Sequence, residues 1–274
     1  MPKNREYGLN RIMSPHLSVT EFIRLASDCG AKYVEIRNDL PDPSLLGGET
    51  AGEINDTCQE TNVSILTVNA LQRFNDPALF EAKKEELQGI MEVAASVGCE
   101  RIVLCPVNDP DDTRTAEQQH ADLVSALVTY APLFRTRGMI GLVEPLGFPI
   151  CSLRYKGQAV QGISESGHRD VYRIVHDSFH HYLSGEAEVF PLETGLVHVS
   201  GVVVQKPTQE LTDDDRVLVD EHDIMANRSQ VAMLRSGGSS AEVCFEPFSS
   251  EMQQLTAPDL KARLKRSVEF LFGP

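Results

Sequence analysis

Four ionisable residues in the second half of the chain each end or closely follow a short apolar run: Glu144 in GLVEPLGF, Asp177 in RIVHDSFHH, His198 in LVHVSG and Glu246 in EVCFEPFS. If these runs are neighbouring parallel strands, their carboxyl ends meet at one face and the four side chains converge. Three carboxylates in one narrow opening repel one another and lose hydration unless a cation neutralises them. The set therefore predicts a metal site, although any one of these residues alone would be an ordinary cap or loop residue.

The ligand types indicate the metal and its chemistry. Three oxygen donors and one imidazole form a mostly hard set, so we expect one divalent ion, with Mn²⁺ first and Mg²⁺, Co²⁺ or Zn²⁺ as alternatives. An ion that binds a carbonyl and the adjacent hydroxyl of a small polyhydroxy substrate stabilises the enediolate formed when a neighbouring proton is removed. Glu144 and Glu246 are then the candidate bases, one on each face of the planar intermediate.

Histidines are dense beside Asp177, where His176, His180 and His181 lie within six residues. The D-S-F-H stretch can place Asp177 and His180 on the same side of the exit from a strand, where we expect His180 to polarise or position a substrate oxygen. His16, His120, His168 and His222 stand in polar surroundings and are expected at the surface.

A repeated order of helix, glycine and strand positions these residues. Ser18 and Glu21 form a capping-box pattern, apolar residues follow at helical spacing, and Gly30 ends the helix before a buried strand at 33–37. Eight short apolar runs occur in this way, at 7–13, 32–37, 64–69, 101–106, 140–145, 172–177, 196–201 and 241–247. They predict a single-domain (β/α)₈ TIM barrel, an α/β fold, over residues 1–274. An open doubly wound sheet is the alternative, but we find no glycine-rich phosphate turn.

Composition narrows the partners and the location. The 274 residues include 25 Lys and Arg against 40 Asp and Glu, a net charge of -15, which disfavours nucleic acids and anionic membranes. No apolar run is long enough for a membrane span and the N-terminus does not resemble a signal peptide, so a cytoplasmic protein is expected. The six cysteines form no C-x-x-C pair and are expected to be reduced core residues. A homo-oligomer is left open.

Several motifs carry a family resemblance: E-P at Glu144, D-x-F-H from Asp177, H-V at His198 and F-E-P around Glu246. With them the whole chain resembles the xylose isomerase-like TIM-barrel superfamily, the sugar phosphate isomerase/epimerase group that also contains endonuclease IV. The resemblance implies that these four residues are the metal ligands and that His180 and Arg216 lie near the substrate oxygens.

Within that group the stretch LTDDDRVLVDEHD resembles the inosose isomerase branch of inositol catabolism. That branch usually follows its arginine with a Pro-Gly pair, whereas this chain has Val219, Asp220, Glu221 and His222. This difference leaves the substrate open.

The expected function is therefore a metal-dependent sugar or polyol isomerase or epimerase, with inosose as one candidate substrate. A dehydratase would use the same ligands and differ in the residue that protonates the leaving group. A non-catalytic polyol-binding barrel and an endonuclease IV-like nuclease are further alternatives. The nuclease would need more ligands on early strands, where the sequence has Asn38, Asn69 and Asn108. An unphosphorylated substrate is favoured because the loop after His198 lacks a glycine-rich cradle, although Lys206 and Arg216 could bind a phosphate.

Overall fold

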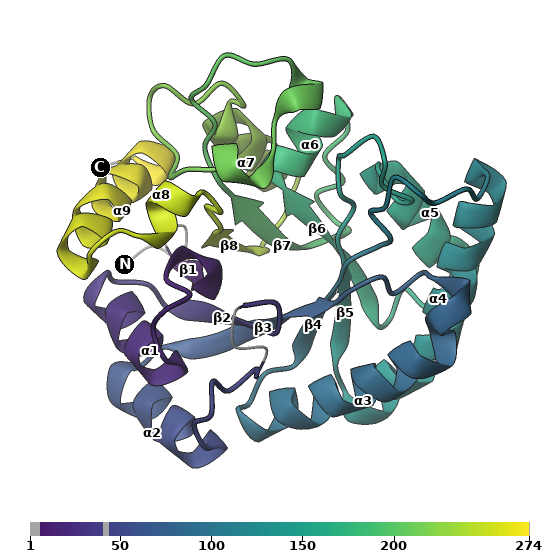
Figure 1. Ribbon diagram of the computed structural model, residues 1–274, viewed down its shortest axis with the longest axis horizontal. Helices are drawn as coiled ribbons and strands as arrows, with labels where there is room; N and C mark the ends of the chain where they lie inside the picture. Colours follow the sequence, from purple (N-terminus) through teal and green to yellow (C-terminus); the bar gives the residue numbers. More distant parts are fainter. Residues whose placement is uncertain (1–5, 41–43, 274) are drawn as a thin grey trace.

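Eight parallel strands close into a barrel, as the sequence predicts. The structure is a computed structural model and describes residues 6–40 and 44–273. Each strand pairs with the next along the chain, and β8 pairs with β1 to close the ring (Figure 1). The strands are β1 (Tyr7–Asn10), β2 (Tyr33–Arg37), β3 (Ser64–Leu71), β4 (Arg101–Leu104), β5 (Ile140–Val143), β6 (Tyr172–Asp177), β7 (Thr194–Val199) and β8 (Glu242–Phe245).

Helices surround the barrel and connect the strands (Figure 1). The α-helices are α1 (Val19–Asp28), α2 (Ala51–Thr61), α3 (Phe80–Ser96), α4 (Ala116–Arg137), α5 (Lys156–Ser166), α6 (Ser178–Ser184), α7 (Asn227–Ser236), α8 (Ser250–Gln253) and α9 (Ala257–Phe272). Short 3₁₀ turns are η2 (Arg11–Met13), η3 (Pro77–Leu79), η4 (Thr208–Glu210) and η5 (Asp213–Asp215). The capping box predicted at Ser18 and Glu21 is present at the start of α1. None of the helices among the described residues is long and apolar enough to cross a membrane.

The inside of the barrel is apolar at mid-height and polar at one end. Buried side chains of alternate strand positions form the apolar layer, among them Leu142, Val175, Leu196 and Cys244. Because side chains alternate along a strand, the residue two positions further on points into the same interior. Those positions are occupied by Glu144, Asp177, His198 and Glu246. The polar set thus stands directly above a packed apolar layer, at the carboxyl ends of the strands.

Four of the six cysteines are buried, as expected of core residues, whereas Cys29 and Cys58 are half-buried. All six are free, and Cys105 and Cys244 contribute to the apolar layer inside the barrel.

Candidate metal centre

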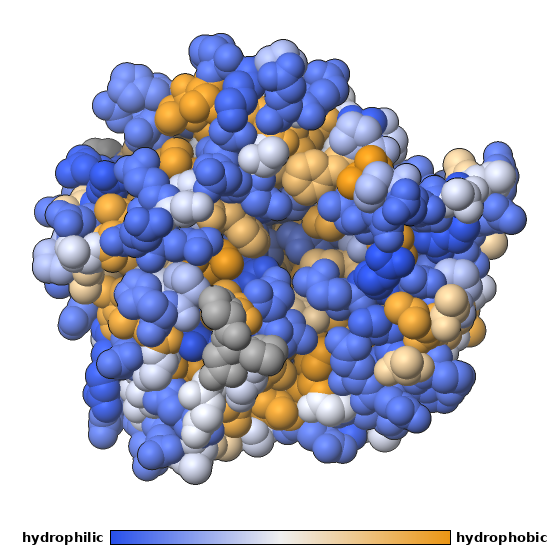
Figure 2. Space-filling model, viewed as in Figure 1, coloured by the Kyte–Doolittle hydropathy of each residue, from blue (hydrophilic) through white to orange (hydrophobic). Residues whose placement is uncertain are grey.

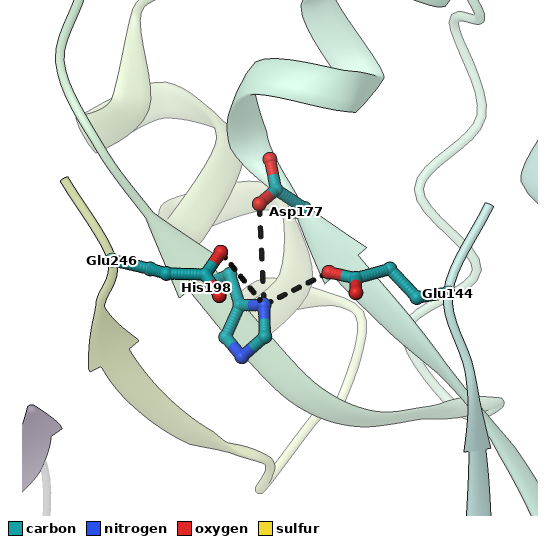
Figure 3. A group of neighbouring side chains, drawn as sticks. All are labelled: Glu144, Asp177, His198 and Glu246. Atoms are coloured by element: carbon teal, nitrogen blue, oxygen red, sulfur yellow. Dashed lines mark hydrogen bonds and ion pairs between the residues drawn. The ribbon is translucent and has the colours of Figure 1, made fainter. Parts of the chain in front are cut away.

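Glu144, Asp177, His198 and Glu246 converge on one point at the carboxyl ends of β5 to β8 (Figure 3). One ligand atom from each residue lies within 4.8 Å of the others, and all four residues are buried. The strand register causes this convergence, because Asp177 is paired with His198 and Val199 is paired with Phe245, which precedes Glu246. The residues that the sequence places together are therefore together in the structure.

The imidazole of His198 lies at the centre of the three carboxylates. Its Nδ1 is 2.9 Å from Glu144 Oε1, 3.3 Å from Glu246 Oε2 and 4.0 Å from Asp177 Oδ2. Burial alone would lower the pKa of His198, but the surrounding carboxylates hold that pKa well above its usual range. A site that favours a positive charge so strongly, with three oxygen donors and one nitrogen donor, fits a divalent cation.

The two oxygens of Asp177 have separate functions. Oδ1 accepts hydrogen bonds from the backbone N–H groups of Phe179 (2.7 Å) and His180 (3.0 Å), which caps the N-terminus of α6. Oδ2 faces the centre and pairs with Arg216 Nη2 at 2.7 Å. Folding of α6 thereby fixes the direction in which Asp177 presents its second oxygen.

Two buried arginines hold Glu246. Arg37 Nη1 lies 2.8 Å from Oε1 and Arg216 Nη2 lies 2.9 Å from Oε2, and both guanidinium groups also pack over the ring of Phe248. Asn10 Nδ2 donates a further hydrogen bond to Oε1 at 3.0 Å. Burial raises the pKa of Glu246 to about 7, although the positive charges of His198 and the arginines act in the opposite direction. Glu246 is therefore firmly oriented.

Glu144 has fewer partners. Besides His198, it receives a hydrogen bond from the thiol of Cys105, whose Sγ lies 3.6 Å from Oε2. The two glutamates thus differ: Glu246 is held by several donors, whereas Glu144 is held by an imidazole and a weak thiol donor.

The remaining predicted site residues occupy different places. His180 is buried between the aromatic rings of Phe148 and Phe179, at centroid distances of 5.3 Å and 5.4 Å, and its Nδ1 has no hydrogen-bond partner among the described residues. Arg216 is in the centre, as described above. Lys206 lies outside the cluster, since its side chain is 41% exposed and its Nζ pairs with Asp215 at 2.6 Å. A substrate contact for Lys206 stays a prediction.

Two further residues of the centre, Glu35 and Arg37, were not predicted from the sequence and point into the barrel from β2. Glu35 is fully buried, and both of its oxygens lie within hydrogen-bond distance of His198 Nε2, at 3.0 Å and 3.2 Å. Burial acts to raise the pKa of Glu35, but His198 and the hydrogen bonds of Asn10 and Thr67 outweigh it and lower the pKa. The segment YVEIR could have indicated both residues. Charged side chains at alternate positions of a strand that is buried on both faces need partners inside the protein.

Comparison with known proteins identifies the family. The family model described as xylose isomerase-like TIM barrel matches residues 23–272. The chain belongs to this family. No curated protein gives a significant match to the chain.

Solved structures agree with that assignment. A xylose isomerase domain containing protein from Salmonella typhimurium LT2 is 33% identical, with 98% of this chain and 97% of that chain covered and a TM-score of 0.90. The IolI protein, solved with a bound zinc atom, is 22% identical over 97% of this chain and 98% of that chain, with a TM-score of 0.88. D-psicose 3-epimerase from Clostridium cellulolyticum H10, solved with D-tagatose, is 13% identical over 97% and 99% of the two chains, with a TM-score of 0.70. The last two likenesses show the fold alone.

The candidate metal centre of this chain consists of Glu144, Asp177, His198 and Glu246. In the described part of the chain they are the one group of His, Cys, Asp and Glu side chains arranged to hold a metal ion. The face in Figure 2 is hollowed near its centre and is largely covered by hydrophilic residues.

Proposed function

We propose that this protein is a metal-dependent isomerase or epimerase that moves a proton at a carbon next to the carbonyl of a small polyhydroxy compound. The observation that carries the proposal is the convergence of three carboxylates and one imidazole at the carboxyl ends of four adjacent strands. Ligands and catalytic groups bind at this end of TIM-barrel enzymes. The IolI protein with its zinc atom and an epimerase with its bound sugar share the fold, which supports the proposal.

Glu144, Asp177, His198 and Glu246 would hold the ion. When bound, a divalent cation there supplies positive charge that stabilises the negative charge developing on the substrate oxygens. We take Mn²⁺ as the first candidate because three of the four donors are carboxylates, and Zn²⁺ as the second because of the zinc atom bound to the IolI protein.

The protein's own groups move the proton. Glu144 and Glu246 approach the centre from opposite sides (Figure 3), so they can reach opposite faces of a planar intermediate. Glu144 is the better first base, because among residues 6–40 and 44–273 its Oε2 interacts only with the weak thiol donor of Cys105. Glu246 would return a proton on the other face for epimerisation. In an isomerisation, one glutamate would return the proton to the neighbouring carbon.

A neutral substrate fits the charges of the site, and inosose is our first candidate. Arg37 and Arg216 are the buried cations of the centre, and their guanidinium groups already pair with acidic side chains. Lys206 is paired with Asp215. A phosphate would have to compete with these carboxylates for each cation, so we propose an unphosphorylated substrate.

Hydrogen exchange tests this function. The protein is incubated with Mn²⁺ in D₂O with inososes, ketohexoses and their phosphates, and loss of substrate C–H signals is followed by NMR. We expect exchange at a carbon next to the carbonyl in an unphosphorylated substrate, dependent on metal and lost in Glu246→Gln. The matched control is Glu242→Gln, at the other end of β8 and paired with Arg101, which keeps the exchange.

Exchange that is indifferent to metal removal would contradict the proposal. Elimination of water after the exchange would make the protein a dehydratase on the same site. Tight sugar binding with no exchange would indicate a binding protein.

A further inference from the structure

Glu35 is a buried carboxylate that belongs to neither the metal cluster nor an ion pair with an arginine or lysine in the described structure. It lies on β2 with 0% of its surface exposed and faces His198 across the barrel. A carboxylate so deep in a protein is costly unless its oxygens are well paired. Its position therefore calls for a specific partner.

That partner is the ring nitrogen of His198 which faces away from the metal centre. Nδ1 is directed at the three carboxylates, whereas the other nitrogen points away from them (Figure 3). Nε2 lies 3.0 Å from Glu35 Oε2 and 3.2 Å from Oε1. An ionised carboxylate only accepts hydrogen bonds, so Nε2 must carry a hydrogen and donate it. In a neutral imidazole, this places the lone pair on Nδ1.

Neighbouring strands hold Glu35 in place. Asn10 on β1 donates to Oε2 at 2.6 Å, and Thr67 on β3 donates to Oε1 at 3.0 Å. Asn69 in turn donates to the Thr67 hydroxyl at 3.0 Å. Side chains from β1, β2 and β3 therefore act together on a residue of β7, although the metal cluster itself comes from the other half of the barrel.

We propose that Glu35 is a positioning residue that holds His198 in the orientation and tautomer in which Nδ1 binds the divalent ion. A carboxylate behind a metal-binding histidine fixes the ring and makes the ligand nitrogen more basic. The first half of the barrel thus contributes to metal affinity without supplying a ligand. This inference rests on the metal-binding part of the proposed function and is independent of the reaction catalysed.

The test is Glu35→Gln, which keeps the shape of the side chain and removes its charge. Competition with a chelator measures the affinity for Mn²⁺, and proton NMR of the Zn²⁺-loaded protein follows the downfield Nε2–H signal of His198. We expect the affinity to fall by about 10- to 100-fold. The Nε2–H signal should move upfield or disappear. Glu242→Gln, which removes a charge at the other end of the barrel, should change neither.

A second variant covers the case in which Glu35→Gln does not fold. Thr67→Val removes one hydrogen bond to Glu35, and we expect a smaller loss of affinity together with an upfield shift of the same Nε2–H signal. If the wild-type protein binds Mn²⁺ and the folded variants keep both its affinity and its Nε2–H signal, the inference is wrong. That result would leave the proposed reaction intact. Conversely, reduced affinity in Glu35→Gln combined with no substrate exchange in the wild type would refute the reaction alone.

Discussion

Asp177 offers a way to separate the folding role of a metal-centre residue from its ligand role. Asp177→Asn keeps an oxygen for the backbone N–H groups of Phe179 and His180, because asparagine is as good an N-cap as aspartate. It removes the negative charge that faces Arg216 and the centre. Asp177→Ala removes both the cap and the charge. The difference between the two variants therefore reports on the cap, and their common loss reports on the charge.

The expected changes in melting temperature follow from these contacts. Loss of an N-cap costs about 1 kcal/mol, so metal-free Asp177→Ala should melt roughly 2–4 °C below Asp177→Asn. Metal at about 1,000 times its Kd stabilises a protein by about 4 kcal/mol, or roughly 10 °C for a chain near this size. Both variants should lose most of that increase, because a neutral side chain replaces one of three anionic donors.

Differential scanning calorimetry with and without Mn²⁺ measures both effects. Thr115→Ala is the control, because the Thr115 hydroxyl caps α4 by accepting from the Gln118 backbone N–H. It should lower the melting temperature and leave the metal-induced increase unchanged. A full metal-induced increase in Asp177→Asn would refute the ligand role of Asp177. Equal stability of Asp177→Ala and Asp177→Asn without metal would refute its role as a cap.

Two further predictions concern stability. Lys156, the first residue of α5, is buried, and burial lowers the pKa of its amine from 10.5 to about 8. Between pH 8 and 10.5 the folded protein binds fewer protons than the unfolded chain, so its stability rises with pH. Raising the pH from 7.5 to 10 should therefore increase the stability of the wild type relative to Lys156→Met by about 2 kcal/mol. A difference in melting temperature between the two proteins that stays constant across this pH range would contradict this. Gly147→Ala should destabilise by about 1–3 kcal/mol, because the new methyl group clashes with the carbonyl oxygen of His180 and lies 2.8 Å from Leu183 Cβ. The free energy of unfolding in urea measures this loss, and Gly89→Ala is the control because its methyl group meets nothing within 4 Å. An equal change in the free energy of unfolding for both variants would refute the steric explanation.

The strand ends made much of the site predictable from sequence. Each of Glu144, Asp177 and Glu246 ends or closely follows an apolar run, and parallel strands bring such positions to one face. His198 belongs to the same pattern because it lies near the end of β7. The order of strands around the barrel then places the four side chains next to one another without any further information.

Glu35 and Arg37 were harder to predict because their roles depend on contacts across the barrel. Glu35 finds its partner His198 more than 160 positions away, and Arg37, besides its pair with nearby Asp39, contacts Glu246 more than 200 positions away. Lys206 shows the opposite problem. It is a basic residue in a loop near the expected mouth, but its amine pairs with Asp215 in the same loop. The sequence contains Asp215 in the same loop but does not show that the two side chains pair, and a substrate contact for Lys206 stays a prediction.

The most direct test of the metal centre is anomalous diffraction from crystals of the protein loaded with Mn²⁺. We expect one anomalous peak within coordination distance of the carboxylate oxygens of Glu144, Asp177 and Glu246 and of His198 Nδ1. The absence of a peak among these groups in fully loaded crystals, or a peak at another position alone, would contradict the account.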